Sequence, residues 1–309
     1  MSKENTAVTK KKIKRCKEDV VFDAACFIIL TLVLFVVAYP LYWVIISSIS
    51  APSAVSSGKV LFHPIGFTLK GYAEVFKNDQ VMRGFLNSLI ITFCGVMVNL
   101  IVTLPTSYAL SRSNFSGKKP ITIFYLITMF FGGGLIPTYL VIQRLQMLNT
   151  IWALILPGCL SVYNMIVART FFKSNISEEL YEAAEIDGCT QARFFFQIAL
   201  PLSKAIIAIL VLYYGVGHWN SYFSALVYIS DKAKYPLQLV LRNILITNQT
   251  ALSQTATTAA ARAALQEKQQ LIDVMKYSLI IISSIPVLVM YPLVQKHFVK
   301  GVMIGSMKG

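Results

Sequence analysis

The stretch Glu182-Ala-Ala-Glu-Ile-Asp-Gly188 lies between two long apolar runs, and the organisation of the chain can be followed outward from it. Asn175 stands three residues before Glu178, a spacing typical of a capping box, and therefore predicts a helix start. Gly188 predicts the end of this helix, because glycine adopts a positive φ at little cost. The stretch is thus expected to be a short helix whose small residues let another surface approach closely.

The flanking runs belong to a strongly apolar chain. Of its 309 residues, 56% are hydrophobic and only 14% are charged, and the mean hydropathy is +0.63. Soluble domains carry about 25% charged residues, so this composition excludes an ordinary soluble domain and indicates an all-α polytopic membrane protein. The net charge is +14, and the basic residues cluster beside apolar runs. This placement favours a role in membrane orientation over nucleic-acid binding.

Six apolar runs are long enough to cross a bilayer as helices, which takes about 20 residues each. They are expected at residues 20–48, 85–110, 121–142, 151–172, 205–228 and 274–294, within a transmembrane domain of residues 20–296. The basic head at residues 1–19 with the apolar run after it has the pattern of a signal peptide as well. That run is about twice the usual signal-peptide core, so a retained first span is the better interpretation.

Basic residues set the expected orientation in the membrane. Half of the 28 Lys and Arg fall in the head, the short loop at 111–119, the segment 173–203 and the tail 297–309. Short cytoplasmic loops are rich in Lys and Arg, so these segments and both termini are expected on the cytoplasmic side of a bacterial cell membrane. Residues 49–80 and 229–271 are then outside.

The opening stretch resembles a known motif. Glu182-Ala-Ala184, Gly188 and the downstream Ile198-x-Leu200-Pro201 resemble the EAA loop of the membrane subunits of ABC importers. Ile186-Asp-Gly188 is similar to the version in the carbohydrate-uptake branch, the maltose-type permeases. That branch often has Pro at the position of Ser177, and serine can also start a helix. Without the resemblance, the stretch would be an incidental amphipathic linker.

The resemblance implies a six-span, type I permease fold and a mechanism for it. Residues 173–203 would be a cytoplasmic coupling loop that docks on a cytosolic ATPase subunit. Glu182 would pair on the ATPase, Ala183 and Ala184 would allow close contact, and Gly188 with Asp187 before it would form the turn. ATP and Mg would bind the two ATPase subunits, and this chain would hold no cofactor. A second permease, an extracellular solute-binding lipoprotein, a carbohydrate and membrane lipids would be the other partners.

A polar cluster interrupts the fifth predicted span. It consists of His218, Trp219, Asn220 and Tyr222, which are costly against lipid and should face protein or water. Hydrogen-bonding groups and aromatic faces suit the pathway of a polyhydroxylated solute. The alternative is that the cluster joins helices, with its polar groups satisfied by neighbours. In maltose-type pairs, moreover, the partner permease carries most sugar contacts.

Three consecutive glycines, Gly132, Gly133 and Gly134, mark the third predicted span. They would allow the helix to unwind beside a cavity, or to pack closely against another helix. We include Gly133 among the candidate pathway residues. The surrounding stretch from Phe130 to Pro137 resembles the branch linked to large or complex oligosaccharides, the LplC-like permeases.

Two further contacts are expected by resemblance. Residues 236–258 of the outside segment would reach the solute-binding protein. The alternative is that they form a solvated cap. Residues 253–272 are predicted to be helical. The tail beginning His297-Phe-Val-Lys300 resembles family tails that touch the ATPase pair, with an idle terminus as the alternative.

The chain lacks several motifs, and their absence limits the chemistry that can be expected of it. It has no Walker-type phosphate loop, so it is not expected to be the ATPase or any other enzyme. His63, His218 and His297 lie far apart, and the five cysteines have no metal-ligand spacing, so no metal site is expected. The rival functions are an ABC importer of amino acids, peptides or metal chelates, a secondary carrier, and a membrane scaffold. Few charged residues lie within the spans, which argues against an ion-driven carrier.

Overall fold

The structure is a computed structural model that describes residues 16–251 and 259–305. All regular secondary structure in these residues is helical. Most of the basic head at 1–19, residues 253–258 of the helix expected at 253–272, and the last four residues of the tail lie outside the described residues.

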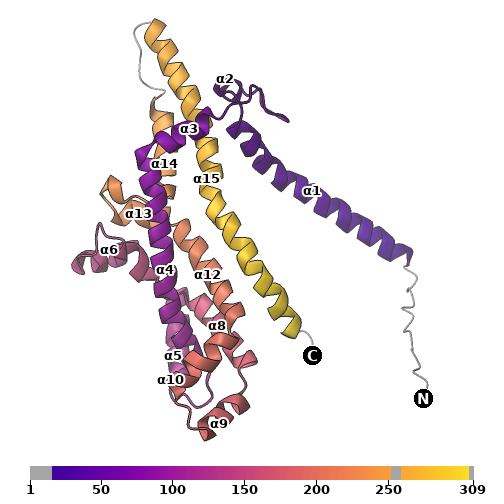
Figure 1. The fold of residues 1–309 in the computed structure, drawn as a ribbon, viewed down its shortest axis with the longest axis vertical. Coiled ribbons are helices and arrows are strands. Elements are labelled where there is room, and N and C mark those ends of the chain that lie inside the picture. Colours follow the sequence, from indigo (N-terminus) through magenta and orange to yellow (C-terminus); the bar gives the residue numbers. More distant parts are fainter. Residues whose placement is uncertain (1–15, 252–258, 306–309) are drawn as a thin grey trace.

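Three helices are long and apolar enough to cross a membrane by themselves. They are α1 (Lys17–Ser48), α4 (Asp79–Ser111) and the part Gln269–Pro292 of α15 (Ala259–Gly305). α1 extends away from the other helices and meets α15 near its own C-terminal end (Figure 1). Only its last residues, Ile46, Ser47 and Ser48, are buried. Its long apolar surface therefore needs lipid or another protein to cover it.

Three bent pairs of helices supply the remaining candidate spans. α5 (Lys118–Phe130) and α6 (Leu135–Arg144) meet at 112°, and α7 (Trp152–Ile155) with η1 (Leu156–Gly158) meets α8 (Val162–Asn175) at 52°. The segment Gln191–Leu202 meets α12 (Lys204–Trp219) at 80°. If each pair is one span, the chain crosses the membrane up to six times, as the all-α six-span fold requires.

The breaks fall where the sequence weakens a helix. α5 ends before Gly132-Gly-Gly134, and Gly134 has a φ of +85° that only glycine adopts easily. Pro157 and Gly158 close η1 before α8 begins. The third break follows a π-helical segment, η2 (Phe195–Ala199), and the one-turn helix α11 (Leu200–Leu202).

α12 ends at Trp219, inside the predicted span 205–228, and α13 (Tyr222–Tyr228) continues after a break. The amide of Asn220 donates to the carbonyl of Val216, and the Asn220 side chain donates to the same carbonyl. These two bonds close the helix at the polar cluster. The cluster therefore lies at a helix end and not in the middle of a continuous helix.

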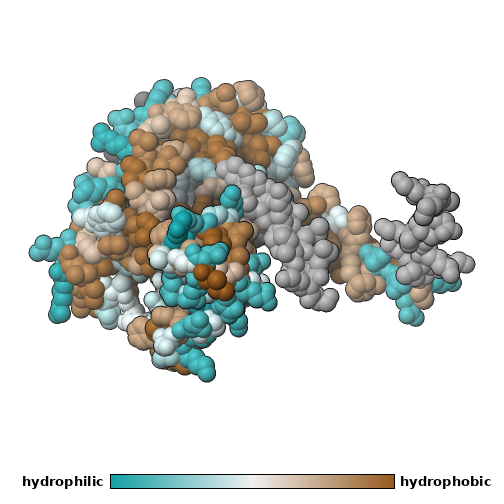
Figure 2. All heavy atoms as spheres, turned by 60° about the horizontal axis from the view of Figure 1, so that its bottom comes forward, coloured by the Kyte–Doolittle hydropathy of each residue, from teal (hydrophilic) through white to brown (hydrophobic). Residues whose placement is uncertain are grey.

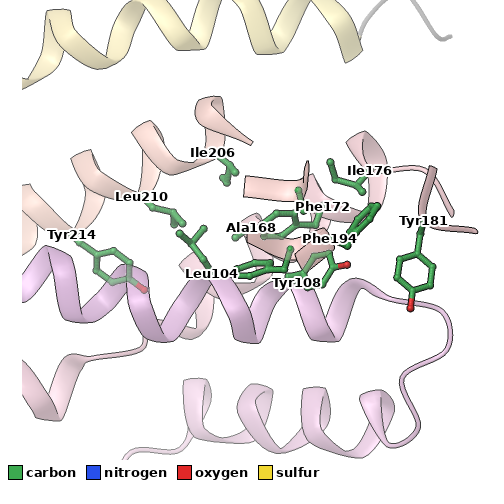
Figure 3. Packing of buried hydrophobic residues seen from close by; sticks show 12 residues of the cluster. Leu104, Tyr108, Ala168, Phe172, Ile176, Tyr181, Phe194, Ile206, Leu210 and Tyr214 are labelled. Carbon is green, nitrogen blue, oxygen red and sulfur yellow. The ribbon is translucent and has the colours of Figure 1, made fainter. Parts of the chain in front are cut away.

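α4 is the central helix, and it packs against α8, α12 and α14 (Leu237–Ala251) (Figure 1). A stripe of small and polar residues is buried along it at near-helical spacing. The stripe consists of Gly84, Ser88, Gly95, Asn99, Thr103 and Ser107. Small residues allow neighbouring helices to approach closely where no hydrophobic effect drives helices together. At the C-terminal end of α4, Leu104 and Tyr108 pack among aromatic and aliphatic side chains of α8, α10 (Gln191–Phe194) and α12 (Figure 3).

The segment predicted as an outside loop, 229–271, contains helices. Leu237, Leu239 and Val240 of α14 are buried, and the Leu237 amide donates to the Ser88 hydroxyl at 2.8 Å. A Cβ on Gly84 would lie 3.3 Å from the Leu237 Cα, so Gly84 admits α14 against α4. The first part of this segment is thus core structure and not a solvated cap. The remaining short helices are α2 (Pro52–Ser56), α3 (Lys70–Lys77) and η3 (Lys232–Lys234).

Candidate functional site

The opening stretch forms α9 (Glu178–Ile186), a short helix at one end of the molecule (Figure 1). The hydroxyl of Ser177 caps it by accepting a hydrogen bond from the Leu180 amide at 3.3 Å. The capping box predicted from Asn175 is wrong, because Asn175 is the last residue of α8 and its side chain donates back to the Phe171 carbonyl. Serine accepts a first-turn amide as well as asparagine does, and it is the residue next to the helix.

α9 ends in a Schellman motif centred on Gly188. The Gly188 amide donates to the Glu185 carbonyl at 3.0 Å, and the Cys189 amide donates to the Ala184 carbonyl at 2.9 Å. Gly188 has a φ of +75°, and a Cβ added there would meet nothing within 4 Å. The glycine is therefore required by the backbone conformation and not by crowding.

The candidate coupling residues lie mainly on the surface. Glu182, Ala183, Asp187 and Gly188 are exposed, and Ala184 is half-buried against the core cluster. Figure 2, in which the end that carries α9 comes forward, shows hydrophilic residues gathered at this end. Ile186 is 87% exposed. The signal available in the sequence was an apolar residue between two acidic residues, Glu185 and Asp187, at the end of a short helix.

One side chain fixes α9 to the rest of the fold. Tyr181 is buried and makes an edge contact with Phe194 at 5.3 Å between ring centroids. On its other side, the Arg112 guanidinium lies 4.1 Å from the centre of the Tyr181 ring. Arg112 comes directly after α4, so Tyr181 connects α9 to both α4 and α10.

Arg112 also forms an ion pair with α9. Its Nη2 donates to Glu178 Oε2 at 2.7 Å, and the Ser113 amide donates to Glu178 Oε1 at 3.1 Å. Lys118 Nζ donates to the carbonyls of Arg112 and Ser113 and so holds this backbone. In the sequence, Arg112 indicates only the membrane orientation of its loop, because nothing there pairs it with Glu178, which is 66 positions away.

The polar cluster is divided by the structure. His218 Nε2 is hydrogen-bonded to Asn99 Oδ1 at 2.6 Å, and Asn99 Nδ2 donates to the carbonyls of Gly158 and Cys159 at 2.8 Å each. A Cβ on Gly95 would lie within 2.7 Å of three imidazole atoms, so the ring rests directly on the α4 backbone. His218 thus joins α12 to α4 and η1, as the helix-joining alternative expects.

The other members of the cluster have different environments. Trp219 is 1% exposed, and its Nε1 donates to the Ser283 carbonyl at 2.9 Å, so it is a core residue of this chain. Asn220 and Tyr222 are exposed. Gly133 is also exposed and lies in the break between α5 and α6, where a Cβ would meet only Pro137 of the following helix. Within the described residues, this is an unwound segment and not a packing contact.

A hollow of about 430 Å³ lies between α8, α12 and α15. Its lining consists of Asn164, Leu212, Tyr213, Val216, Val287 and Tyr291. Tyr213 is 44% exposed and Tyr291 is 56% exposed. The Asn164 residue is only 6% exposed, and its side-chain amide bonds no described residue. The hollow thus offers aromatic faces and an unused amide on three helices that the sequence did not bring together.

The described residues contain no group of three or more His, Cys, Asp or Glu that could hold a metal ion. Two exposed features of the described residues are the helix α9 and the hollow lined by Tyr213 and Tyr291. Together with up to six spans, they define a multi-pass membrane permease.

Comparison with known proteins places the chain more narrowly. It is 35% identical over 288 residues to the polygalacturonan/rhamnogalacturonan transport system permease protein YtcP of Bacillus subtilis, covering 93% of this chain and 98% of that one. It is 38% identical over 289 residues to protein LplC of the same organism, covering 94% and 95%. No family model matches the chain.

A solved structure agrees with these relatives. The crystal structure of a bacterial ABC transporter involved in import of the acidic polysaccharide alginate contains a chain that matches with a TM-score of 0.82 and 27% identity. The match covers 92% of this chain and 99% of that chain. The chain belongs to the family of carbohydrate ABC transport system permeases. It has the ABC-importer permease fold, as the EAA-like stretch predicted.

Proposed function

We propose that this chain is one of two permease subunits of an ATP-driven importer that takes up oligosaccharides or complex glycans from a binding protein. The names of its relatives support the cargo class: they include permeases for polygalacturonan or rhamnogalacturonan and for galactooligosaccharides. The amino-acid, peptide and metal-chelate alternatives have no such support.

The observation that carries the mechanism is the exposed helix α9 joined to the end of α4 by side-chain contacts. Tyr181, Arg112 and Glu178 connect its inner face to the end of the central helix, and its outer face stays free. A force applied to that outer face would be transmitted to α4 instead of bending a loose loop. Glu182 and Asp187 would provide charged contacts on the ATPase, and Ala183 and Ala184 would allow close approach.

Ile186 adds an apolar contact to this surface, because its side chain is almost fully exposed. ATP and Mg would bind on the ATPase pair. The part of this chain is to hold α9 in place and to pass its displacement to the spans.

The proposed orientation places α9 and both termini in the cytoplasm. α1, the C-terminal end of α14 and the N-terminal end of α15 would then contact the remaining partners. The apolar surface of α1 would be covered by the second permease and by lipid, because it is exposed over most of its length. The solute-binding protein would approach from the opposite end of the molecule, where α14 and the start of α15 extend farthest from α9 (Figure 1).

The hollow lined by Tyr213 and Tyr291 is the proposed surface for sugar in this subunit. Sugar rings present CH groups that pack on aromatic faces and hydroxyls that need hydrogen-bond partners. The Asn164 amide is nearly buried and without a described partner, so it is available to such a hydroxyl. Trp219 is not available, because it is buried and its Nε1 is already bonded.

The test replaces Glu182 by Lys and measures uptake of labelled oligosaccharides together with ATP hydrolysis by the complete importer. Uptake is expected to fall strongly while the chain still inserts in the membrane. The matched control is Glu179→Lys, a change of the same charge on the first turn of the same helix. Uptake that is equally normal in both variants would contradict the coupling role.

Orientation has a separate test. Cysteine is introduced by Glu185→Cys into a chain whose five native cysteines are replaced by serine. A membrane-impermeant thiol reagent added outside intact cells is expected to leave it unlabelled, and labelling is expected after the membrane is opened. Labelling from outside would show that α9 cannot meet a cytosolic ATPase.

A further inference from the structure

A second hollow, of about 320 Å³, lies beside the C-terminal end of α4 and is strongly basic. Its lining consists of Ser111, Lys118, Lys119, Thr122, Ile123, Arg169 and Lys173. Four of these seven residues are cations, and none is acidic. They come from the N-terminus of α5 and the C-terminal half of α8, which are separated by about a sixth of the chain's length but adjacent in the fold.

In the described part of the chain, no carboxylate pairs with the cations of this hollow. None of the four forms an ion pair with any described residue. Glu178, which is close in the fold, is already paired with Arg112. Arg169 Nε donates to the Leu110 carbonyl, and Lys118 Nζ donates to two backbone carbonyls. Lys119 and Lys173 form no such bond with the described residues, and both are exposed.

The start of α5 makes the charge excess larger. A helix N-terminus carries partial positive charge and favours anions, yet the first turn of α5 holds two lysines and no acid. Its cap residue is Gly117, which offers no side chain to the first-turn amides. An anion bound here would meet both the lysines and the helix end. The general enrichment of basic residues on inner loops explains their number, but not their convergence on one hollow.

An apolar surface leads away from the hollow. Ile123, Phe124 and Ile127 of α5 are each more than half exposed. A phospholipid has this combination of chemistry, an anionic headgroup joined to hydrocarbon chains. A free phosphate or a nucleotide would use the cations and leave the apolar surface uncovered.

We infer that the hollow between α5 and α8 is a binding site for the headgroup of an anionic phospholipid, whose acyl chains lie along α5. The headgroup phosphate is held by Lys119, Lys173 and the free side of the Arg169 guanidinium. Lys118 links this site to the coupling helix, since it also holds the backbone at Arg112 that pairs with Glu178. Bound lipid therefore stabilises the segment through which α9 meets α4.

The test uses the full chain in its complex, purified in detergent and supplied with phosphatidylglycerol, phosphatidylcholine or inorganic phosphate. Lipid binding is measured by native mass spectrometry, and thermal unfolding gives a second readout. Phosphatidylglycerol is expected to bind and to raise the unfolding midpoint, and the other two are expected to do so much less.

The double variant Lys119→Gln/Lys173→Gln is expected to bind phosphatidylglycerol about 30-fold more weakly, because each charge near an anionic surface is worth about 1 kcal/mol. Lys119→Arg/Lys173→Arg should retain binding. Lys59→Gln/Lys70→Gln removes two exposed lysines elsewhere and serves as the charge-matched control.

Two outcomes overturn the inference. One is equal weakening by the control pair, which would mean that net charge alone attracts the lipid. The other is an equal effect of inorganic phosphate, which would make the hollow a site for free anions. A variant that does not fold is replaced by Lys119→Gln alone, for which about fivefold weakening is expected.

Discussion

Arg112 and Glu178 are joined by a 2.7 Å ion pair that connects the end of the central helix α4 to the first turn of α9. The Arg112 side chain is only 12% exposed, because the Tyr181 ring covers one of its faces. The pair is a direct contact between α9 and the end of α4, beside the packing of Tyr181 in the same core cluster as Tyr108. The pair contributes more to the placement of α9 than to the stability of the fold, because the Glu178 carboxylate is partly open to solvent.

Replacing Arg112 by Ala removes the ion pair and the cation–π contact together. We expect a loss of about 1 kcal/mol in stability and a much larger loss of transport, because α9 would remain folded but move independently of α4. The measurement is oligosaccharide uptake per ATP hydrolysed by the complete importer. Arg112→Lys should lie between the two, since lysine keeps the charge without the planar group that stacks on Tyr181.

The control for this prediction is Lys77→Ala, which removes an exposed ion pair with Glu74 far from α9. An unchanged ratio of uptake to hydrolysis in Arg112→Ala would show that the Arg112–Glu178 pair does not transmit motion.

The helix α9 could be predicted from sequence because its signals are local. The Gly188 stop and the helical spacing of Leu180, Ala183 and Ala184 lie within one helix and its turn. The start was misplaced by two residues, because Asn175 and Ser177 are both good capping residues and only the end of α8 decides between them. The contact with Arg112 could not be found, because it depends on how α4 and α8 pack.

Substitutions at Gly188 can show whether the backbone conformation or steric crowding requires glycine in this turn. Gly188→Ala is expected to cost about 1–2 kcal/mol, since a left-handed φ is unfavourable for a residue with a Cβ. Gly188→Asn should cost less, because asparagine adopts that conformation more readily. Thermal unfolding and uptake are measured for both variants. Equal losses in Ala and Asn would contradict the left-handed φ as the reason for glycine at this position.

The polar cluster shows where sequence reasoning reached its limit. His218, Trp219, Asn220 and Tyr222 are consecutive or nearly so, and a sequence pattern treats them as one feature. A helix rotates each successive side chain by about 100°, so neighbours in sequence point to different surroundings. Trp219 enters the core, His218 faces α4, and Asn220 closes the helix. The groups that line the hollow, Asn164, Tyr213 and Tyr291, come from three separate helices.

Gly95 and His218 make a second testable pair. Gly95→Ala is expected to destabilise the protein by about 1–3 kcal/mol, because its Cβ would collide with the imidazole. In a His218→Ala background the same change should cost much less, since the ring is gone. The measurement is a double-mutant cycle of thermal unfolding. Additive losses would mean that Gly95 matters for a reason other than the His218 ring.

The hollow between α8, α12 and α15 leads to the last prediction, which separates sugar contact from stability. Tyr213→Ala removes a half-exposed aromatic face, so we expect the oligosaccharide concentration for half-maximal uptake to rise about tenfold with little change in folded protein. Trp219→Phe is the contrast: it removes the bond to the Ser283 carbonyl and is expected to lower stability by about 1 kcal/mol without changing that concentration. Uptake over a range of oligosaccharide concentrations, with the amount of folded protein measured in parallel, distinguishes the two. If Tyr213→Ala lowers only the amount of folded protein, the hollow is a packing surface for the second permease and the sugar passes elsewhere.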